Sequence, residues 1–197
     1  MRLVEMAGLS AESVDRVRGI YESAFPDDLL VPFEDLAVDR MLVLVDDDGP
    51  AGLALVRDLA TTSWTFLRYY AAGRRGQGIG SLMWAELTAR LAAEDRTLLV
   101  WDVEDPDEPD LPAELVEEHR RRIAFYERLG GLLLPVVEYF PPHDDGHTPA
   151  LRLMCTPLGD APVPPVRAVV EGAYLHRYGR SADDPVVRRT LEASNLI

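Results

Sequence analysis

The sequence predicts a mixed α/β (α+β) fold, with about seven strands that helices flank. Three observations predict it. Short apolar runs typical of strands alternate with amphipathic stretches that have helical periodicity. One central strand leads into a glycine-rich turn that opens a helix. A later, nearly continuous apolar run, residues 96–103, is typical of a strand that is buried on both faces.

Composition limits the kind of protein. Of the 197 residues, 47% are hydrophobic and 27% are charged, as in ordinary globular domains. The net charge of −14 disfavours a nucleic-acid partner, because the phosphate backbone would be repelled. It is compatible with a cationic substrate, although acidity also favours solubility by itself. No apolar run is long enough for a membrane span or a signal peptide, so we expect a cytoplasmic protein with no membrane partner.

The first part of the chain predicts a strand, two helices and a hairpin. Residues 3–6 form the strand, and Ser10 caps a helix over residues 11–25 whose apolar side chains recur at helical spacing. Pro32 opens a second, short helix, because proline fits the first helical turn. Residues 41–45 and 51–59 are two antiparallel strands that an acidic turn joins.

The central stretch combines an apolar strand (residues 64–72), a glycine-rich turn (73–80) and an amphipathic helix. Gly76, Gly78 and Gly80 let the backbone turn sharply and present N–H groups where the helix begins. These groups lack internal partners, and the helix dipole adds roughly half a positive charge, so the turn can bind a phosphate or pyrophosphate. Arg74 and Arg75 add cationic side chains. The spacing fits neither a P-loop nor a dinucleotide-binding turn.

The second part of the chain predicts an acidic loop, a helix and two strands. The apolar strand 96–103 ends in six carboxylates interleaved with prolines: Asp102, Glu104, Asp105, Asp107, Glu108 and Asp110. Open α/β sheets place ligands at the carboxyl ends of such strands. Residues 114–129 form a helix that two glycines end, and residues 132–139 and 151–156 are strands.

No metal site is expected. The three aspartates at residues 46–48 lack the alternating spacing of an EF-hand loop. His143 and His147 lie in a connection between strands without a matching third ligand, which favours a polar rim. The single cysteine, Cys155, excludes an internal disulfide, and its strand pattern indicates a buried thiol.

Two motifs resemble a known superfamily. The run from Arg75 to Gly80, RGQGIG, follows a strand and opens a helix, and it resembles the acetyl-CoA pyrophosphate loop [RQ]-x-x-G-x-[GA] of GNAT N-acetyltransferases. Residues 123–130, IAFYERLG, resemble the second GNAT signature, A-x-x-FYE-x-x-G-F, whose tyrosine lies beside the thioester sulfur. Here His119 replaces an asparagine often found seven residues before that tyrosine, and Gly131 replaces the final phenylalanine.

The resemblance implies a GNAT domain over residues 1–158. Its mixed, mostly antiparallel, twisted sheet of about seven strands would be splayed between the fourth and fifth strands, where acetyl-CoA would enter as cosubstrate. The residues that would bind it are Tyr70, Ala71, Ala72, Arg75, Gly76, Gln77, Gly78, Ile79, Gly80, Ser81 and Tyr126. Residues 159–197 lie outside the pattern as a C-terminal helical extension, with helices expected over residues 166–178 and 183–193. That extension can cover the sheet, contact a second subunit in a homodimer, or close over the substrate site.

The implied activity is acetyl transfer from acetyl-CoA to a primary amine of a small molecule or peptide, through a tetrahedral intermediate. The Tyr70 amide would hold the thioester carbonyl, and Tyr126 would protonate the departing sulfur. Glu104, or alternatively Asp102 or a water, would take the amine proton. Because residues two apart on a strand share a face, the two carboxylates are expected to serve one pocket. The alternatives are a CoA-binding sensor or scaffold without catalysis, a partner-binding subunit, and an acyltransferase that uses a longer acyl-CoA.

Overall fold

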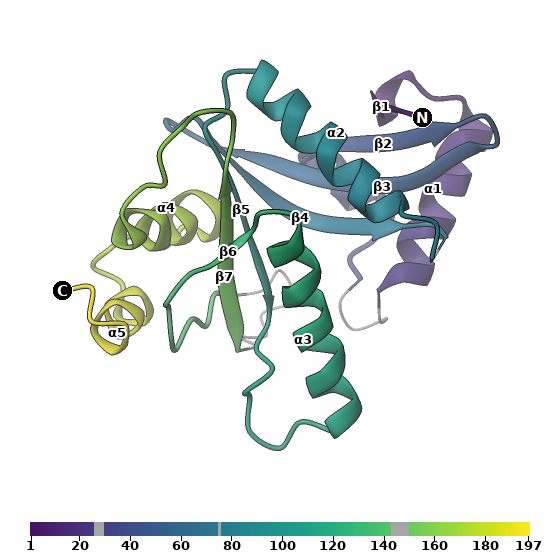
Figure 1. Cartoon of the computed structure of the whole chain (residues 1–197). Coiled ribbons are helices and arrows are strands. Elements are labelled where there is room, and N and C mark those ends of the chain that lie inside the picture. The colour runs from purple at the N-terminus through teal and green to yellow at the C-terminus, as the bar shows by residue number, and fades with distance from the viewer. Residues whose placement is uncertain (26–29, 75, 143–149) are drawn as a thin grey trace. The chain divides into compact units, whose positions relative to one another are not determined.

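The computed structural model describes residues 1–25, 30–74, 76–142 and 150–197 (Figure 1). Within these residues, seven strands follow the sheet order β1-β2-β3-β4-β5-β7-β6. The strands are β1 (Arg2–Glu5), β2 (Arg40–Asp46), β3 (Gly49–Leu59), β4 (Trp64–Ala72), β5 (Leu98–Glu104), β6 (Leu132–Leu133) and β7 (Leu151–Pro157). The helices are α1 (Ala11–Ala24), α2 (Ile79–Ala93), α3 (Ala113–Arg128), α4 (Val166–Tyr178) and α5 (Pro185–Ala193), with short 3-10 helices η1 (Met6–Gly8) and η3 (Phe33–Val38). The predicted mixed, mostly antiparallel fold is confirmed.

The chain forms two compact units. The first comprises residues 1–57 and 67–95, and the second comprises residues 58–66 and 96–197. The unit boundary therefore crosses β3 and β4, so each of these strands contributes residues to both units.

The first unit is a sheet with helices on both faces (Figure 1). The strand β2 pairs antiparallel with both β1 and β3, and its side chains alternate between the faces. On one face, Val43 packs with Val17 of α1. On the other face, Leu44 packs with Met83 of α2. The predicted cap of α1 is present, because the Ser10 side chain accepts a hydrogen bond from the Ser13 amide at 3.3 Å.

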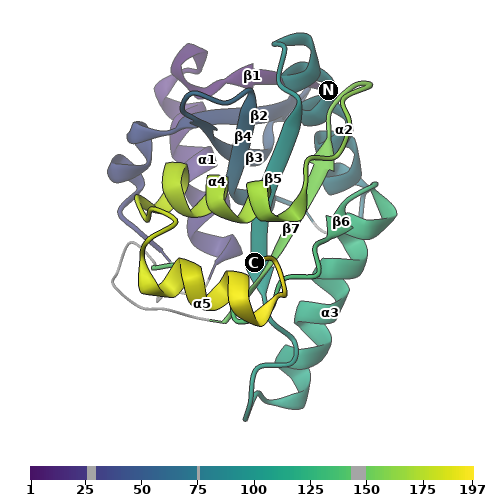
Figure 2. The same ribbon diagram turned by 90° about the vertical axis from the view of Figure 1, so that its left-hand side faces the viewer.

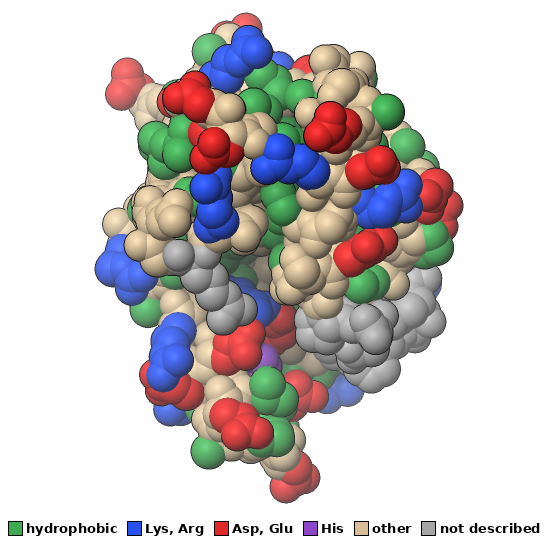
Figure 3. All heavy atoms as spheres, turned by 90° about the vertical axis from the view of Figure 1, so that its right-hand side faces the viewer, with side chains coloured by type: hydrophobic (Ala, Val, Ile, Leu, Met, Phe, Trp, Pro, Cys, Tyr) green, Lys and Arg blue, Asp and Glu red, His purple; other side chains and the backbone are tan. Residues whose placement is uncertain are grey.

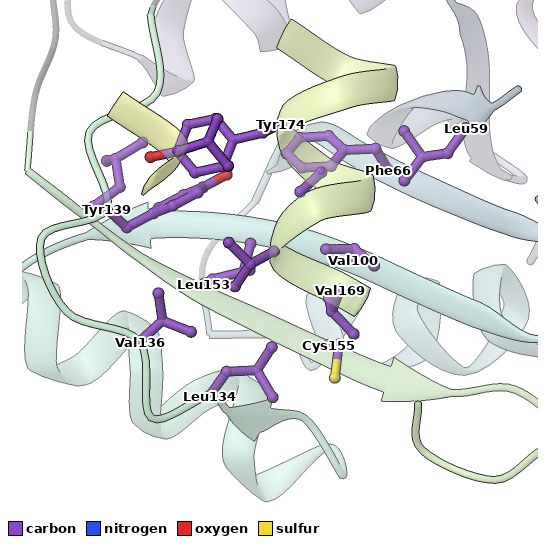
Figure 4. Close-up of a cluster of buried hydrophobic side chains, with 14 of the residues drawn as sticks. Leu59, Phe66, Val100, Leu134, Val136, Tyr139, Leu153, Cys155, Val169 and Tyr174 are labelled. Carbon is purple, nitrogen blue, oxygen red and sulfur yellow. The ribbon is translucent and has the colours of Figure 1, made fainter. Parts of the chain in front are cut away.

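The second unit has a core to which the C-terminal helices contribute. Helices α4 and α5 lie side by side in front of β5 and β7 in Figure 2. Val169 and Tyr174 of α4 lie against Val100 and Leu153 of the strands (Figure 4). All four of these residues are fully buried. The C-terminal helices are therefore part of the hydrophobic core of this unit.

The parallel pairing between β4 and β5 within the second unit is short. Its register runs from Trp64–Leu98 to Phe66–Val100, within the second unit. In contrast, the antiparallel register of β5 with β7 continues to Glu104. Within the second unit, the parallel register therefore ends at Phe66 of β4 and Val100 of β5.

The predicted strand over residues 132–139 is wrong beyond its start. The strand β6 covers only Leu132–Leu133. Pro135 follows, and proline has no N–H group to donate to a strand ladder. The Val136 amide instead donates to the Leu134 carbonyl at 2.7 Å, and Glu138 has a φ of 51°. The chain pairs with β7 again only at a single bridge between Tyr139 and Leu151.

Burial of four tyrosine hydroxyls and one cysteine thiol predicts a steep loss of stability at alkaline pH. Burial raises the pKa of Cys155 to about 11, and it raises the pKa of four tyrosine hydroxyls above the usual 10: Tyr126, Tyr139, Tyr174 and Tyr178. The unfolded chain loses these protons first, so their contribution is fully present below about pH 9 and falls at higher pH, by about 1.4 kcal/mol per pH unit for each group.

Urea unfolding between pH 8 and pH 11 measures this loss. The free energy of unfolding should stay level to about pH 9 and then fall. A Cys155→Ala variant serves as the control, since it should lack the part of the fall that begins near pH 9 and retain the tyrosine part. A level free energy up to pH 11 would contradict the assignment of these buried groups.

Candidate functional site

The glycine-rich turn of the first unit has the backbone conformation that only glycine adopts readily. Gly76 and Gly78 have φ values of +78° and +70°. A Cβ atom added at either position would meet no atom within 4 Å. The space beside both glycines is therefore open. Arg75, which the resemblance also assigns to this turn, lies outside the described residues.

The start of α2 has backbone amides that can bind an anion. No side chain caps the helix at Gly78, and its first turn contains no acidic residue. The Leu82 amide bonds to the Gly78 carbonyl at 3.0 Å, so intrahelical bonding begins there and the preceding amides have no partner within the helix. Those amides belong to Ile79, Gly80 and Ser81, and the helix dipole favours negative charge beside them.

The side chain of Tyr70 supports this helix start. Its hydroxyl donates to the Gly80 carbonyl at 2.5 Å, and its ring packs edge-on against Trp84 at 5.8 Å. Ile79 is buried in the α2-facing core, whereas Gln77 and Ser81 are exposed. On β4, Ala71 is buried in the α1-facing core and Ala72 is partly buried.

Arg74 forms ion pairs with two aspartates of the β2–β3 hairpin. Its guanidinium contacts Asp46, the last residue of β2, at 2.6 Å and Asp48, in the connection to β3, at 3.6 Å. The acidic hairpin turn therefore binds Arg74. Through the Gly73 amide, which donates to the Ala51 carbonyl at 2.8 Å, the same hairpin also holds the start of the glycine-rich turn.

In the second unit, Glu104 and Tyr126 belong to one polar cluster with Arg122. The α3 helix places Arg122 and Tyr126 four residues apart, on one face. The Arg122 guanidinium forms an ion pair with Glu104 Oε1 and another, at 3.0 Å, with Glu118. Glu104 Oε2 is buried and has no hydrogen-bond partner among the residues that the structure describes. One carboxylate oxygen is thus paired and the other is available to a proton.

The hydroxyl of Tyr126 is buried and keeps its proton. Its side chain is 6% exposed, and its ring lies 5.0 Å from that of Trp101. Burial raises the pKa of Tyr126, the Arg122 charge opposes the rise, and the Glu104 charge adds to it. A Cβ atom at Gly131 would come within 3.0 Å of the Trp101 ring, so Trp101 fills the space beside this glycine.

Asp102, the second candidate base, contacts a different helix from Glu104. The hydroxyl of Tyr178, at the end of α4, donates a hydrogen bond to Asp102 Oδ2. Glu104 pairs with Arg122 of α3. These contacts do not test whether the two carboxylates serve one pocket, so that expectation stays a prediction.

The acidic loop after β5 is partly neutralised. Asp107 lies 3.7 Å from Arg120, and Asp105 lies 3.6 Å from Arg152. Figure 3 correspondingly shows acidic and basic side chains interspersed over one face of the molecule. Among the described residues, no group of three or more histidine, cysteine, aspartate or glutamate side chains could hold a metal ion. His143 and His147 lie outside those residues.

Sequence reasoning missed Arg122 and Tyr178. The spacing of four residues between Arg122 and Tyr126 was a usable signal, because such residues share a helix face. Tyr178 had no such signal, since it is 76 positions from Asp102 and outside the GNAT-like pattern. His119, which replaces the expected asparagine, is 8% exposed, and its Nδ1 atom has no hydrogen-bond partner within the described part of the chain.

No helix in the described ranges has both the length and the apolar character needed to cross a membrane. No protein-family model matches the chain, and no curated protein matches its sequence.

Solved structures do match. A GNAT-family structure from Bacteroides thetaiotaomicron aligns with a TM-score of 0.65 at 20% identity, over 92% of this chain and 100% of that one. An aminoglycoside 6′-N-acetyltransferase complexed with coenzyme A gives 0.61 at 16% identity, over 83% and 100%. The ribosomal-protein-S18-alanine N-acetyltransferase of Escherichia coli gives 0.57 at 18% identity, over 81% and 95%. This chain therefore has the fold of the GNAT acetyltransferases.

Proposed function

We propose that the protein is an N-acetyltransferase that transfers the acetyl group of acetyl-CoA to a primary amine of a small molecule or peptide. The observation that carries the proposal is the start of α2, which no side chain caps and which follows two glycines in the left-handed conformation. This is a binding site for a diphosphate, and the solved structures of the same fold include one with coenzyme A bound.

The proposed binding mode uses backbone groups. The amides of Gly76 and of residues 78–81 hold the diphosphate, and Arg75 adds positive charge. Residues 70–72 of β4 bond to the pantetheine chain as a strand would. Open space beside Gly76 and Gly78 supports this mode, because a side chain at either glycine would enter the volume next to the diphosphate.

In the proposed chemistry, one side chain accepts a proton and another donates one. The neutral amine attacks the thioester carbonyl, and the Tyr70 amide holds the resulting oxyanion, a contribution of about 3 kcal/mol. Glu104 takes the amine proton directly or through water. The C–S bond then breaks, and Tyr126 donates its proton to the sulfur. Tyr126 regains a proton from solvent while Glu104 releases one, so the protons balance.

Arg122 supports both proton transfers. Its ion pair with Glu104 holds Oε1, while Oε2 has no hydrogen-bond partner among the described residues and is the oxygen that would accept the proton. Its charge also stabilises the tyrosinate that forms when Tyr126 gives up its proton. The raised pKa keeps Tyr126 protonated at rest. The neighbouring Arg122 charge lowers the cost of its transient ionisation.

An amine panel with acetyl-CoA tests the proposed function. Thiol release that depends on the amine is the expected result, with acetylated amine as the product. Butyryl-CoA and longer donors in parallel distinguish an acetyltransferase from a longer-chain acyltransferase. CoA binding without transfer to any amine would support a sensor or scaffold instead, and the absence of any thermal shift with acetyl-CoA would support a partner-binding subunit.

Replacing Glu104 by glutamine should lower kcat by about 100-fold, because a positioned general base contributes roughly that much or more. The dissociation constant for CoA should change little. Glu118→Gln is a matched control, since Glu118 pairs with the same Arg122 and is more exposed. Equal kcat values for Glu104→Gln and the wild type would remove the base role from Glu104.

A further inference from the structure

Gly131 lies just before β6 and holds the backbone of Tyr126. Its amide donates to the Tyr126 carbonyl at 2.9 Å. Gly130, the residue before it, has a φ of +88°, and its amide donates to the Glu127 carbonyl at 3.0 Å. The two glycines therefore end α3 with bonds back to its last turn, and one of these bonds fixes the peptide group of Tyr126.

The Trp101 ring occupies the space that a side chain at position 131 would need. A Cβ atom at Gly131 would come 3.0 Å from Trp101 Cζ2 and 2.9 Å from the Tyr126 carbonyl oxygen. A larger residue would therefore have to displace Trp101, Tyr126 or both. Gly131 does not have a positive φ, so close packing and not backbone conformation explains the glycine here.

The same Trp101 ring packs against the ring of Tyr126. The two ring centroids lie 5.0 Å apart, and the ring planes are tilted by 49°. Trp101 is 1% exposed, and it lies in β5 opposite Met154 of β7. Strand pairing fixes its backbone and close packing surrounds its ring, so the indole has little room to move away from a new side chain.

Building on the proposed function, we infer that Trp101 and Gly131 are positioning residues that set where the Tyr126 hydroxyl lies. Trp101 holds the ring of Tyr126, and Gly131 holds its backbone. The close approach of the indole requires that position 131 carry no side chain. A general acid must lie within hydrogen-bond reach of the atom that it protonates, and a misplacement of about 1 Å can lower a rate by about 100-fold.

A Gly131→Ala variant tests this inference. Its methyl group would press on Trp101 and Tyr126, so kcat for thiol release should fall by about tenfold or more, while the Kd for CoA stays within about twofold. Adding Trp101→Phe removes the indole atoms nearest to the methyl group. The double variant should therefore recover about threefold or more in kcat over Gly131→Ala, a coupling that a general loss of stability would not produce.

Gly172→Ala is the matched control, because it also forces a glycine of the second unit against a tryptophan. A Cβ atom at Gly172 would come 2.7 Å from the Trp64 ring. Trp64 packs in the core that contains Val100, and Val100 and Trp101 point to opposite faces of the sheet. Gly172→Ala should therefore lower the melting temperature at least as much as Gly131→Ala and keep the wild-type kcat. Wild-type kcat in Gly131→Ala, or an equal loss of kcat in both variants, would overturn the inference.

Carbon-13 NMR of labelled tyrosine reports the position of the Tyr126 ring without turnover, and a Tyr126→Phe variant identifies its signal. Gly131→Ala and Trp101→Phe should each shift this signal, because the ring current of the adjacent indole changes with distance and angle. Gly172→Ala should leave it in place. An unchanged Tyr126 signal in Gly131→Ala would overturn the inference whether or not the protein is active, whereas absence of thiol release with every amine would contradict the proposed function alone.

Discussion

Replacing Gly78 by alanine should weaken CoA binding at least tenfold. The residue adopts a φ of +70° at the start of α2, where alanine costs about 1 kcal/mol or more of strain. The new methyl group would also enter the open space beside the turn, where the diphosphate is proposed to lie. Isothermal titration with CoA measures the loss, which should appear as a higher Kd with an unchanged stoichiometry.

Gly159→Ala separates strain from binding. Gly159 has a φ of +60°, and a Cβ atom there would also meet no atom within 4 Å. The two variants should therefore lose similar thermal stability, and only Gly78→Ala should lose affinity for CoA. Equal Kd values for Gly78→Ala and the wild type would show that the turn does not hold the diphosphate.

Replacing Tyr126 by phenylalanine should lower kcat by about 100-fold, since a positioned general acid contributes that much or more. Its ring packs on Trp101 and would remain in place without the hydroxyl, so the Kd for CoA should stay within about twofold. Stopped-flow measurement of thiol release, together with CoA titration, separates the two effects.

Tyr139→Phe is a suitable control for that variant. Tyr139 is also buried in the second unit, and burial also raises the pKa of its hydroxyl, but it packs on Tyr174 and not on α3. It should retain the wild-type kcat. A Tyr126→Phe variant that is as active as Tyr139→Phe would exclude Tyr126 as the proton donor to sulfur.

Most of the fold could be predicted from the sequence because its signals are local. Two apolar runs joined by an acidic turn identify β2 and β3, and the Ser10 cap and the helical spacing after it identify α1. The one long error, the strand over residues 132–139, arose where apolar composition suggested a strand but Pro135 could not join a ladder. Composition shows that a segment is buried, and backbone hydrogen bonding decides whether it is a strand.

The candidate site was predictable only in part for the same reason. The turn before α2 is contiguous, so the spacing of Gly76 and Gly78 already implies its conformation. The partners of Glu104 and Asp102 come from α3 and α4, and helix packing brings them to β5. Such pairs depend on long-range packing, which no local spacing encodes. The shared pocket expected for these two carboxylates stays a prediction, because contacts with different helices do not test it.

The most direct test of the account follows the backbone amides of the turn in 15N-labelled protein while CoA is added. The account predicts that the amide signals of Gly76, Gly78, Ile79, Gly80 and Ser81 shift together and saturate at the Kd measured by titration. The amide of Gly159, which has a similar conformation elsewhere in the chain, should not move. Saturating CoA that leaves all five turn amides unshifted would contradict the claim that this helix start holds the diphosphate.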